Sequence, residues 1–341
     1  MPIRIGMIGG GSITRLRHAP ECRDNPYCEI AGFYDHNIER SETLVEEFGG
    51  KSYSSCNEML ADPDIDAVCI CSSNDTHARI AIDALSAGKH VLCEKPMAAN
   101  VKEAAAMVKA AESNQRTLMI AHNQRFVPAH IKAREMIASG SLGRVISFRA
   151  SLKHGGPENW SVVKSNKTWF FNESRAVFGV MGDLGIHKAD LLRYLLNDEV
   201  DSVLCLADTV EKRNESGNLI GLDDIAFATL KMSGGAVGTL EVSWCNHGQM
   251  EDFVVVYCEN GVIRLLQDPV YQIVIEQRDG EVLRLSMPEP QNGSGIMDAF
   301  AASVLSGTEP SVSGKDALLS LAVITACLES SKKESWVKVN P

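Results

Sequence analysis

Short apolar segments alternate with amphipathic segments through the first third of the chain. Each apolar segment is long enough for one buried strand, and each amphipathic segment has the spacing of a helix. The expected strands are residues 3–8, 28–34, 67–71, 90–93 and 117–121, and the expected helices are residues 38–48, 57–61, 77–87 and 100–114. Strands that are apolar throughout are typical of parallel sheets covered on both faces. The alternation predicts an α/β fold with a doubly wound sheet of six strands, in which residues 67–71 form the fourth strand and the third has no clear bounds in the sequence.

The pattern changes after residue 123. Strand-like segments now follow one another, most of them joined by short turns, at residues 145–153, 200–209, 224–232, 236–244, 251–258, 262–266 and 271–277. Strands connected in this way favour an antiparallel sheet. Helices are expected near the end, at residues 295–306 and 313–330. We therefore expect one domain over residues 1–123 and a second α/β domain, with a large, mostly antiparallel open sheet, over residues 124–341.

A glycine-rich turn directly follows the first expected strand. In a dinucleotide-binding fold, the first glycine makes a tight turn and the second lets the backbone approach the pyrophosphate. Gly9 and Gly11 occupy these two places, and Ser12 and Ile13 open the helix that follows. Thr14 stands where a third small residue is usual. The turn favours a dinucleotide site, although a glycine-rich turn alone is a weak signal.

A carboxylate at the end of the second strand adds to this signal. Asp35 lies about 20 residues beyond the glycines, where an acidic residue accepts a hydrogen bond from the adenosine ribose. This position favours NAD, because a carboxylate repels the 2′-phosphate of NADP. His36 and Arg40 could receive a 2′-phosphate, so NADP stays open. A solvated aspartate at a strand end is the alternative.

Composition and charge limit the partners that we expect. Acidic residues outnumber basic residues by 44 to 33, and the formal net charge of −11 argues against nucleic acid. No apolar run reaches the roughly 18 residues of a membrane span, so no membrane partner is expected. The first residues enter a strand without a charged leader, which favours a cytoplasmic protein.

The ten cysteines do not form the paired clusters of a zinc site. Cys69 and Cys71 lie two residues apart in an apolar strand, and no second cluster in the sequence completes a metal site around them. We therefore expect buried, reduced thiols and no metal.

Residues with catalytic potential occur in two places. The strand at residues 90–93 delivers Glu94 and Lys95 to the edge of the sheet where ligands of this fold bind. Asp183, His187 and Asp190 have the spacing i, i+4 and i+7, which predicts one helical face.

The chemistry of these residue types suits alcohol oxidation. A histidine beside a carboxylate can accept a hydroxyl proton at neutral pH, and Lys95 could polarise the same oxygen. The spacing of the helical group also fits a solvated face, a structural hydrogen-bonded trio, or a metal site of two carboxylates and one histidine. Spacing alone leaves these alternatives open.

Five motifs together resemble the Gfo/Idh/MocA oxidoreductase family, which includes glucose-fructose oxidoreductases and inositol dehydrogenases. The motifs are residues 9–13 (GGGSI), 74–77 (NDTH), 94–96 (EKP), 124–126 (QRF) and 182–190 (GDLGIHKAD). The resemblance extends over essentially the whole chain. Its most specific parts are the Glu-Lys-Pro motif and the Asp-x-Gly-x-His-x-x-Asp motif.

The resemblance implies an N-terminal Rossmann dinucleotide-binding domain and a role for each matching residue. Lys95 would orient and polarise the substrate hydroxyl, Asp183 would bind substrate and support the histidine, and His187 would be the general acid/base. The residues expected to bind the cofactor are Gly9, Gly11, Ser12, Ile13, Asp35, His36, Ser73, Asn74, His77, Glu94, Lys95, Gln124 and Arg125. Ser73 stands where many members have proline, and the Lys95-Pro96 bond is a candidate cis peptide.

The loop at residues 154–160 resembles a loop of sugar- or inositol-processing members, so His154 and Trp160 are expected to contact substrate. A loop that only packs on the sheet is the alternative. The implied reaction is NAD(P)-dependent hydride transfer between nicotinamide and a secondary hydroxyl of a cyclic polyol, sugar or sugar derivative. A redox-neutral sugar-processing enzyme with tightly bound NAD(P) and a non-catalytic NAD(P)-binding regulator stay open. The C-terminal sheet often forms the oligomer interface in this family, which implies a homodimer or homotetramer.

Overall fold

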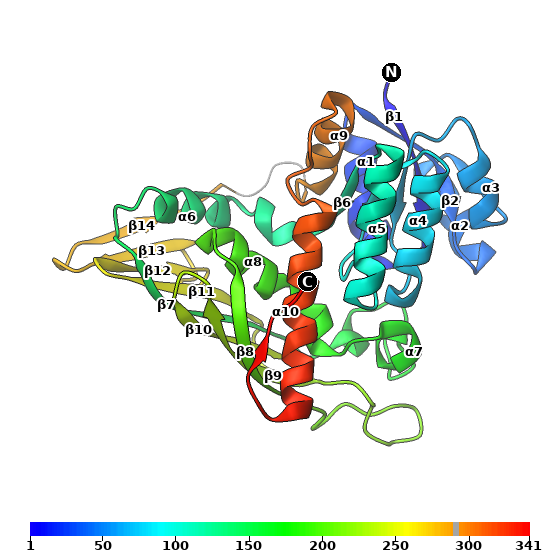
Figure 1. The fold of residues 1–341 in the computed structure, drawn as a ribbon. Helices are drawn as coiled ribbons and strands as arrows, with labels where there is room; N and C mark the ends of the chain where they lie inside the picture. The colour runs from blue at the N-terminus through cyan, green and yellow to red at the C-terminus, as the bar shows by residue number, and fades with distance from the viewer. Residues whose placement is uncertain (289–292) are drawn as a thin grey trace. The chain divides into compact units, whose positions relative to one another are not determined.

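The first sheet is fully parallel and follows the order β3-β2-β1-β4-β5-β6 (Figure 1). Its strands are β1 (Ile3–Ile8), β2 (Cys28–Tyr34), β3 (Lys51–Ser52), β4 (Ala67–Ile70), β5 (His90–Cys93) and β6 (Leu118–Ile120). Strands β2 and β3 lie on one side of β1, and strands β4, β5 and β6 lie on the other. Because the crossovers between parallel strands are right-handed, the connecting helices lie on both faces of the sheet. This topology confirms the predicted doubly wound sheet.

The helices around this sheet begin where the sequence provides side-chain caps. They are α1 (Ala19–Asp24), α2 (Ile38–Phe48), α3 (Cys56–Ala61), α4 (His77–Ser86), α5 (Val101–Asn114) and α9 (Ile296–Ser306). The side chains of Asn37, Ser55 and Asn100 accept backbone N–H groups in the first turns of α2, α3 and α5. These caps explain why the predicted and observed helix starts agree within one residue.

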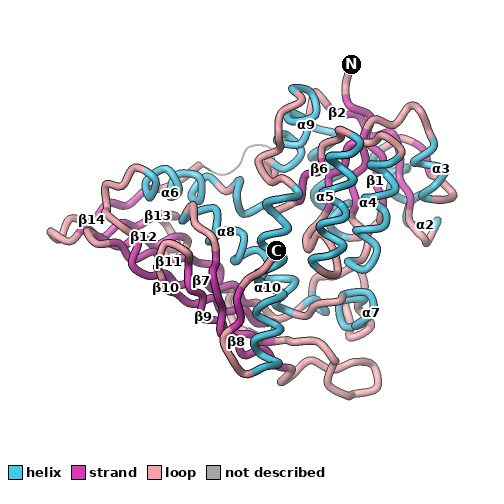
Figure 2. The backbone as a smooth tube through the Cα atoms, viewed as in Figure 1, coloured by secondary structure: helices cyan, strands magenta, loops and turns pink. Residues whose placement is uncertain are grey.

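The second sheet has nine strands in the order β14-β13-β12-β11-β7-β10-β9-β8-β15 (Figure 2). They are β7 (Val145–Lys153), β8 (Val200–Asp208), β9 (Ile225–Met232), β10 (Val237–Ser243), β11 (Glu251–Cys258), β12 (Gly261–Leu265), β13 (Ile273–Gln277), β14 (Val282–Leu285) and β15 (Val337–Lys338). Only the pair of β7 and β10 is parallel among the described strands of this sheet. The prediction of a mostly antiparallel sheet is confirmed.

Helices cover one face of the second sheet. Helices α6 (Pro128–Ala138) and α8 (Ile186–Leu196) contact each other and pack on β12 and β7. Exposure alternates along β9, where Ala226, Ala228 and Leu230 are buried and Phe227 between them is exposed. The remaining helices are α7 (Glu173–Ala176) and α10 (Gly314–Lys333).

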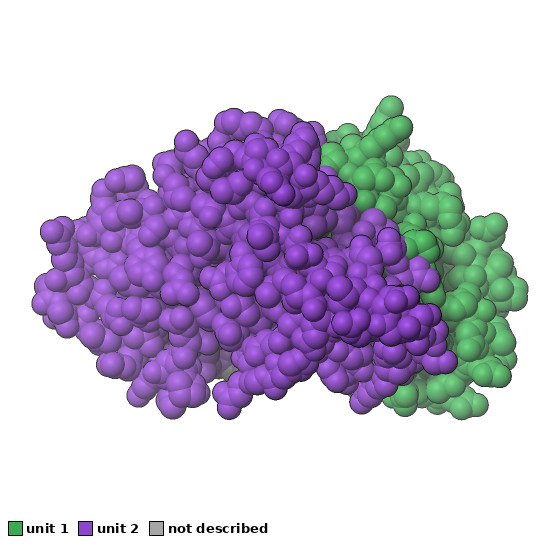
Figure 3. Space-filling view, turned by 90° about the horizontal axis from the view of Figure 1, so that it is seen from below, with its two compact units in different colours: residues 1–123, 174–176, 291–319 green, residues 124–173, 177–290, 320–341 purple. Residues whose placement is uncertain are grey.

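The computed structural model describes residues 1–288 and 293–341, and these divide into two compact units (Figure 3). Among the described residues, the first unit contains 1–123, 174–176 and 293–319. The second contains 124–173, 177–288 and 320–341. None of the described helices combines the length and apolar character needed to cross a bilayer.

Several elements lack the sequence signals on which the predictions rest. Helix α6 was not expected because only Ala129, His130 and Ala133 are buried along it, which leaves a weak apolar stripe. Strands β3 and β15 are two residues long, and the four residues of β14 are largely exposed. Short or exposed strands of this kind are held by pairing with a neighbour, which apolar periodicity does not reveal.

Candidate active site

The strand order reverses between β1 and β4, and ligands of doubly wound sheets bind at such a point. Gly9 follows β1 with φ +104°, and a Cβ added there would lie 2.6 Å from the backbone carbonyl of Cys71. A side chain at Gly9 is therefore excluded by both conformation and space. A Cβ on Gly11 would meet no atom within 4 Å, so this backbone is open to a close approach. Both features suit the pyrophosphate of a dinucleotide.

The unusual third residue of the glycine turn has a structural role. Thr14 is fully buried, and its hydroxyl donates a hydrogen bond of 2.5 Å to the carbonyl of Gly9. It begins a π-helical turn, Thr14–His18, directly after Ser12 and Ile13. The threonine thus holds the tight turn in place instead of providing the small packing surface of glycine or alanine.

Asp35 lies beside the glycine turn, as a ribose-binding carboxylate should. Its Oδ2 accepts the N–H of Gly10 at 2.7 Å, and its Oδ1 accepts the N–H of Asn37 at 2.8 Å. The ring of His36 lies 3.1 Å from the same carboxylate and is largely exposed. The Cβ of Arg40 would lie 3.2 Å from a Cβ on Gly10, which places the stem of this arginine against the turn.

Three predicted cofactor residues fix the loops that follow β4 and β5. The buried ring of His77 lies 2.9 Å from the carbonyl of Pro96 and 3.0 Å from the carbonyl of Ser72. Burial lowers the pKa of His77, so the neutral ring donates to one of these carbonyls at a time. Asn74 donates to the carbonyl of Ala176 at 2.7 Å, and Ser73 is buried between these contacts. The Lys95-Pro96 peptide bond is cis, as predicted.

Glu94 pairs with a residue that the sequence did not single out. Its Oε1 lies 2.8 Å from Nε2 of His18, which is fully buried at the end of the π-helical turn. Its Oε2 accepts the backbone N–H of Lys95 at 3.1 Å. Burial opposes both charges, yet the hydrogen bond and charge of His18 hold the pKa of Glu94 below its usual range. Against the effect of burial, the charges of Cys71 and Glu94 raise the pKa of His18.

Asp183 and His187 lie on one nearly continuous helix. Asp183 belongs to a π-helical turn, Met181–Gly185, that leads directly into α8, and His187 lies in the first turn of α8. Such π turns are frequent at functional sites. Asp183 is buried and accepts the indole N–H of Trp244 at 3.1 Å. Within residues 181–193, all of which the structure describes, only His187 is not buried.

A second carboxylate, that of the half-buried Asp223, holds the start of this helix. Its Oδ1 and Oδ2 accept the N–H groups of Gly179 and Met181 at 3.1 and 2.7 Å, and its carbonyl accepts Val180 at 2.7 Å. These are the amide groups that a helix N-terminus leaves without partners. A Cβ on Gly179 would lie 2.0 Å from the carbonyl of Asp223, so the approach requires glycine.

Changing Asp223 to Asn should remove a pH dependence of stability. Burial raises the pKa of Asp223 to about 6, whereas the unfolded carboxyl titrates near its usual value of about 4. The folded chain therefore binds this proton more tightly, and its contribution to the unfolding free energy is complete below about pH 4. That contribution falls by roughly 2 to 3 kcal/mol as the pH rises through about 6. Urea unfolding of both proteins between pH 4 and 7 measures the difference.

The matched control for this experiment is Asp208→Asn, which alters an exposed carboxylate of the same unit. Its pH profile should parallel that of the wild type. A parallel profile for Asp223→Asn as well would contradict the assigned titration.

Two predicted cofactor residues have side-chain partners in the second unit. The guanidinium of Arg125 donates to Asp190 at 2.7 and 2.6 Å, and both side chains are almost fully buried. Asp190 also accepts the hydroxyl of Ser320 at 2.9 Å. The amide of Gln124 donates to Asp252 at 3.2 Å, and the same carboxylate pairs with the buried Lys188. The third member of the predicted helical trio is therefore tied to Arg125.

The two residues predicted to contact substrate lie next to each other. The rings of His154 and Trp160 meet edge to face, with centroids 6.1 Å apart. Trp160 also meets Phe170 edge to face, with ring centroids 5.0 Å apart. Phe170 in turn stacks on Trp169, with ring centroids 4.0 Å apart. Trp160 is 41% exposed, so this cluster presents an aromatic surface to solvent.

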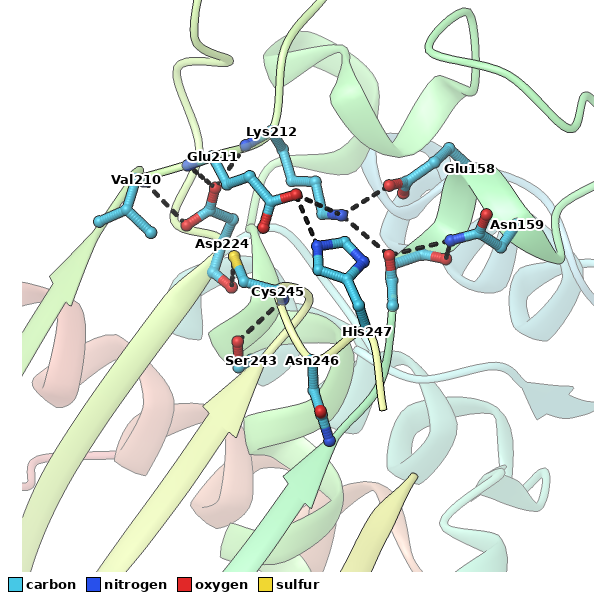
Figure 4. A network of polar contacts seen from close by, with 12 residues as sticks. Glu158, Asn159, Val210, Glu211, Lys212, Asp224, Ser243, Cys245, Asn246 and His247 are labelled. Atoms are coloured by element: carbon cyan, nitrogen blue, oxygen red, sulfur yellow. Dashed lines mark hydrogen bonds and ion pairs between the residues drawn. The ribbon is translucent and has the colours of Figure 1, made fainter. Parts of the chain in front are cut away.

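Buried charges hold the loop that carries His154 and Trp160 (Figure 4). The ammonium of Lys212 donates to the carbonyl of Gly155 at 2.8 Å and to Glu158 at 2.6 Å. Asp224 in turn holds the segment at residues 210–212. Its fully buried carboxylate accepts the backbone N–H groups of these three residues at 2.7 to 2.9 Å. Buried polar contacts therefore hold this loop in place.

The chain matches one family along most of its length. Residues 3–122 match the family described as an oxidoreductase family with an NAD-binding Rossmann fold. Residues 130–264 match the GFO/IDH/MocA C-terminal domain.

Characterised relatives act on sugars and related polyols. A 1,5-anhydro-D-fructose reductase of Ensifer adhaerens is 28% identical, with 96% of each chain covered. A myo-inositol 2-dehydrogenase of Thermotoga maritima is 27% identical and covers 99% of this chain and 98% of its own. Among solved structures, a levoglucosan dehydrogenase in complex with NADH has a TM-score of 0.89 at 26% identity, with both chains fully covered. An aldose-aldose oxidoreductase of Caulobacter crescentus, complexed with glycerol, has a TM-score of 0.86 at 26% identity over 99% of this chain and all of its own.

Proposed function

The chain belongs to the Gfo/Idh/MocA oxidoreductase family, and we propose that it oxidises a secondary hydroxyl of a cyclic sugar or polyol with His187 as general base. It is an NAD(P)-dependent oxidoreductase with an NAD-binding Rossmann domain. The proposal concerns the substrate class and the roles of individual residues.

The partial exposure of His187 carries the proposal. The helix from Met181 to Arg193 is buried along its length, apart from this one half-buried imidazole. A titratable side chain that is partly exposed on an otherwise buried helix is well placed to receive a substrate proton. Asp223 and Trp244 support the position by holding the helix start and Asp183.

The roles of the other two residues follow from their charge. Lys95 is the only residue between Val91 and Ala98 that is not buried, so its ammonium can polarise a hydroxyl oxygen. Asp183 keeps carboxylate oxygens within reach of a substrate hydroxyl while Trp244 holds one of them. NAD, when bound, accepts the hydride from the carbinol carbon. The imidazole of His187 takes the hydroxyl proton that must leave in the same reaction.

A sugar or polyol ring suits the surface around His154. Such a ring has apolar C–H faces and polar hydroxyl edges, and aromatic side chains with a few fixed polar groups bind both. Trp160 and Phe170 supply the aromatic surface, and His154 adds a ring that accepts the N–H of Gly156 at 3.0 Å. The names of the relatives support this class, since they include an anhydrosugar reductase and an inositol dehydrogenase.

A redox-neutral reaction is the second candidate, favoured by the similarity to an aldose-aldose oxidoreductase. The two candidates differ in net NADH formation. The purified chain should therefore be incubated with NAD or NADP and a panel of inositols, free sugars, anhydrosugars and glycosides, while NADH absorbance is recorded. Turnover with one class would support the dehydrogenase. Product formation without net NADH would support the redox-neutral enzyme, and bound cofactor without any product would contradict both.

Replacing Asp35 by alanine should weaken NAD binding more than NADP binding. The variant loses the carboxylate that we propose binds the adenosine ribose, and it also frees the N–H of Gly10. We expect the preference for NAD over NADP to fall by roughly tenfold, the effect of about 1.4 kcal/mol at one polar contact. Fluorescence titration with NADH and NADPH measures it. Asp75→Ala, in the loop after β4, is the control, and an unchanged ratio in Asp35→Ala would place the ribose contact elsewhere.

We also propose that a second copy of the chain covers the open face of the nine-stranded sheet. Leu206 and Phe227 are paired across β8 and β9 and are 59% and 44% exposed, with Leu204 beside them.

Replacing both Leu206 and Phe227 by glutamate should dissociate the oligomer, because charges would lie in the apolar centre of the interface. Light scattering measures the mass of the particle. Leu305→Glu, an equally exposed leucine in the first unit, should leave the mass unchanged, and the same mass in all three proteins would exclude this face.

A further inference from the structure

A cluster of three metal-ligating side chains lies in the core of the first unit. Cys69 and Cys71 occupy alternate positions at the end of β4, so their side chains lie on one side of the strand. Their sulfur atoms are 3.6 Å apart. A ring nitrogen of His18 completes the group, with all three ligand atoms within 4.8 Å of one another. His18 and Cys69 are fully buried, and Cys71 retains 8% of its exposure.

The hydrogen bonding of His18 leaves one nitrogen for a ligand. Nε2 is bound to Glu94 at 2.8 Å. Nδ1 is buried and has no hydrogen-bond partner among the described residues. Metal-binding histidines usually donate their other ring N–H to a carboxylate, which fixes the tautomer and the ring direction. Glu94 provides this arrangement on Nε2, so Nδ1 can bind an ion once it has released its proton.

We propose that His18, Cys69 and Cys71 form a three-coordinate site for a soft, thiophilic metal ion, and that copper(I) fits it best. Two thiolates bound to one metal at about 2.3 Å lie about 4.0 Å apart at the 120° angle of a three-coordinate site, so a shift of about 0.4 Å from the observed 3.6 Å suffices. Thiolate and imidazole ligands are the set that copper(I) and zinc prefer. Zinc takes four ligands, whereas the cluster contains three among the described residues. Binding displaces the protons carried by the two thiols and by Nδ1 of His18, and no oxidant or reductant is required.

The site lies directly beneath the loops assigned to the cofactor. Cys71 precedes Ser72 and Ser73, and its carbonyl contacts Gly9. His18 ends the π-helical turn that follows the glycine turn, and Glu94 adjoins Lys95. The inference does not depend on the proposed reaction, because metal binding can be measured without substrate or turnover.

Titration of the full-length chain with copper(I) tests the proposal. The titration is done without oxygen against a chromophoric copper(I) chelator that competes for the ion. The wild type should retain one equivalent that Cys69→Ala/Cys71→Ala does not retain. X-ray absorption of the loaded wild type should show a shell of two sulfurs and one nitrogen.

The chain contains other buried thiols, so matched controls are needed. Cys93→Ala removes a fully buried thiol from the neighbouring strand β5 and should retain the same equivalent as the wild type. Equal retention by the double variant would overturn the proposal, as would a wild type that loses all copper(I) to the chelator. If the double variant does not fold, the absorption spectrum decides, and a shell with sulfur but no nitrogen would exclude His18.

Discussion

Replacing His187 by alanine is expected to lower kcat by roughly 10²- to 10⁴-fold while NAD binding stays nearly intact. The imidazole is the one side chain of the helix at residues 181–193 that is not buried, and it lies on the unit that does not contain the glycine turn. Its loss removes the proton acceptor but leaves Gly9, Gly11 and Asp35 unchanged. Steady-state kinetics and NADH fluorescence titration measure the two effects separately.

A second histidine of the same unit provides the matched control. His247 is 64% exposed in its side chain and pairs with Glu211 at 2.7 Å, a surface contact of little energetic value. His247→Ala should change kcat by less than about threefold, in line with the small effects of exposed contacts. If His187→Ala also keeps near-normal turnover, another group is the base. If it instead loses NAD affinity to the same extent as turnover, the role of His187 is in binding.

The first sheet could be predicted closely because its strands are encoded locally. The apolar runs at β1, β2 and β5 match the observed strands residue for residue. Each is bounded by a glycine, a capping residue or a short polar turn, and these signals depend on neighbours in sequence. The Glu-Lys-Pro motif and the helix of Asp183 and His187 were found for the same reason.

The supporting contacts of the candidate site could not be predicted in this way. His18 and Glu94 are 76 residues apart, and Asp223 lies 44 residues beyond Gly179. Each pair forms because the fold brings two buried polar groups together, and burial makes such partners necessary. The Cys-X-Cys segment shows the same limit, since the imidazole near it comes from the turn after β1. A single sequence indicates the polar residues but not which of them meet.

Replacing Arg125 by methionine should lower the unfolding free energy by roughly 3 to 5 kcal/mol. Arg125 and Asp190 are only 7% and 1% exposed in their side chains and form two hydrogen bonds. The variant would leave the buried carboxylate of Asp190 with the hydroxyl of Ser320 and a longer ion pair to Arg193 at 4.0 Å. Urea unfolding, followed by fluorescence of the tryptophans, measures the change. All four tryptophans belong to the unit that contains this pair.

The double variant Arg125→Met/Asp190→Leu separates the cost of a buried carboxylate that has lost Arg125 from the value of the pair. Replacing both members of a buried ion pair by apolar residues is often neutral, so most of the lost stability should return. If the double variant is no more stable than Arg125→Met, the loss comes from packing around the arginine rather than from Asp190. The double variant also tests the cofactor role that is predicted for Arg125.

With stability restored, an NADH affinity of the double variant equal to that of the wild type would make Arg125 a structural residue. A tenfold weaker affinity would show that the guanidinium acts on the cofactor as well as on the helix.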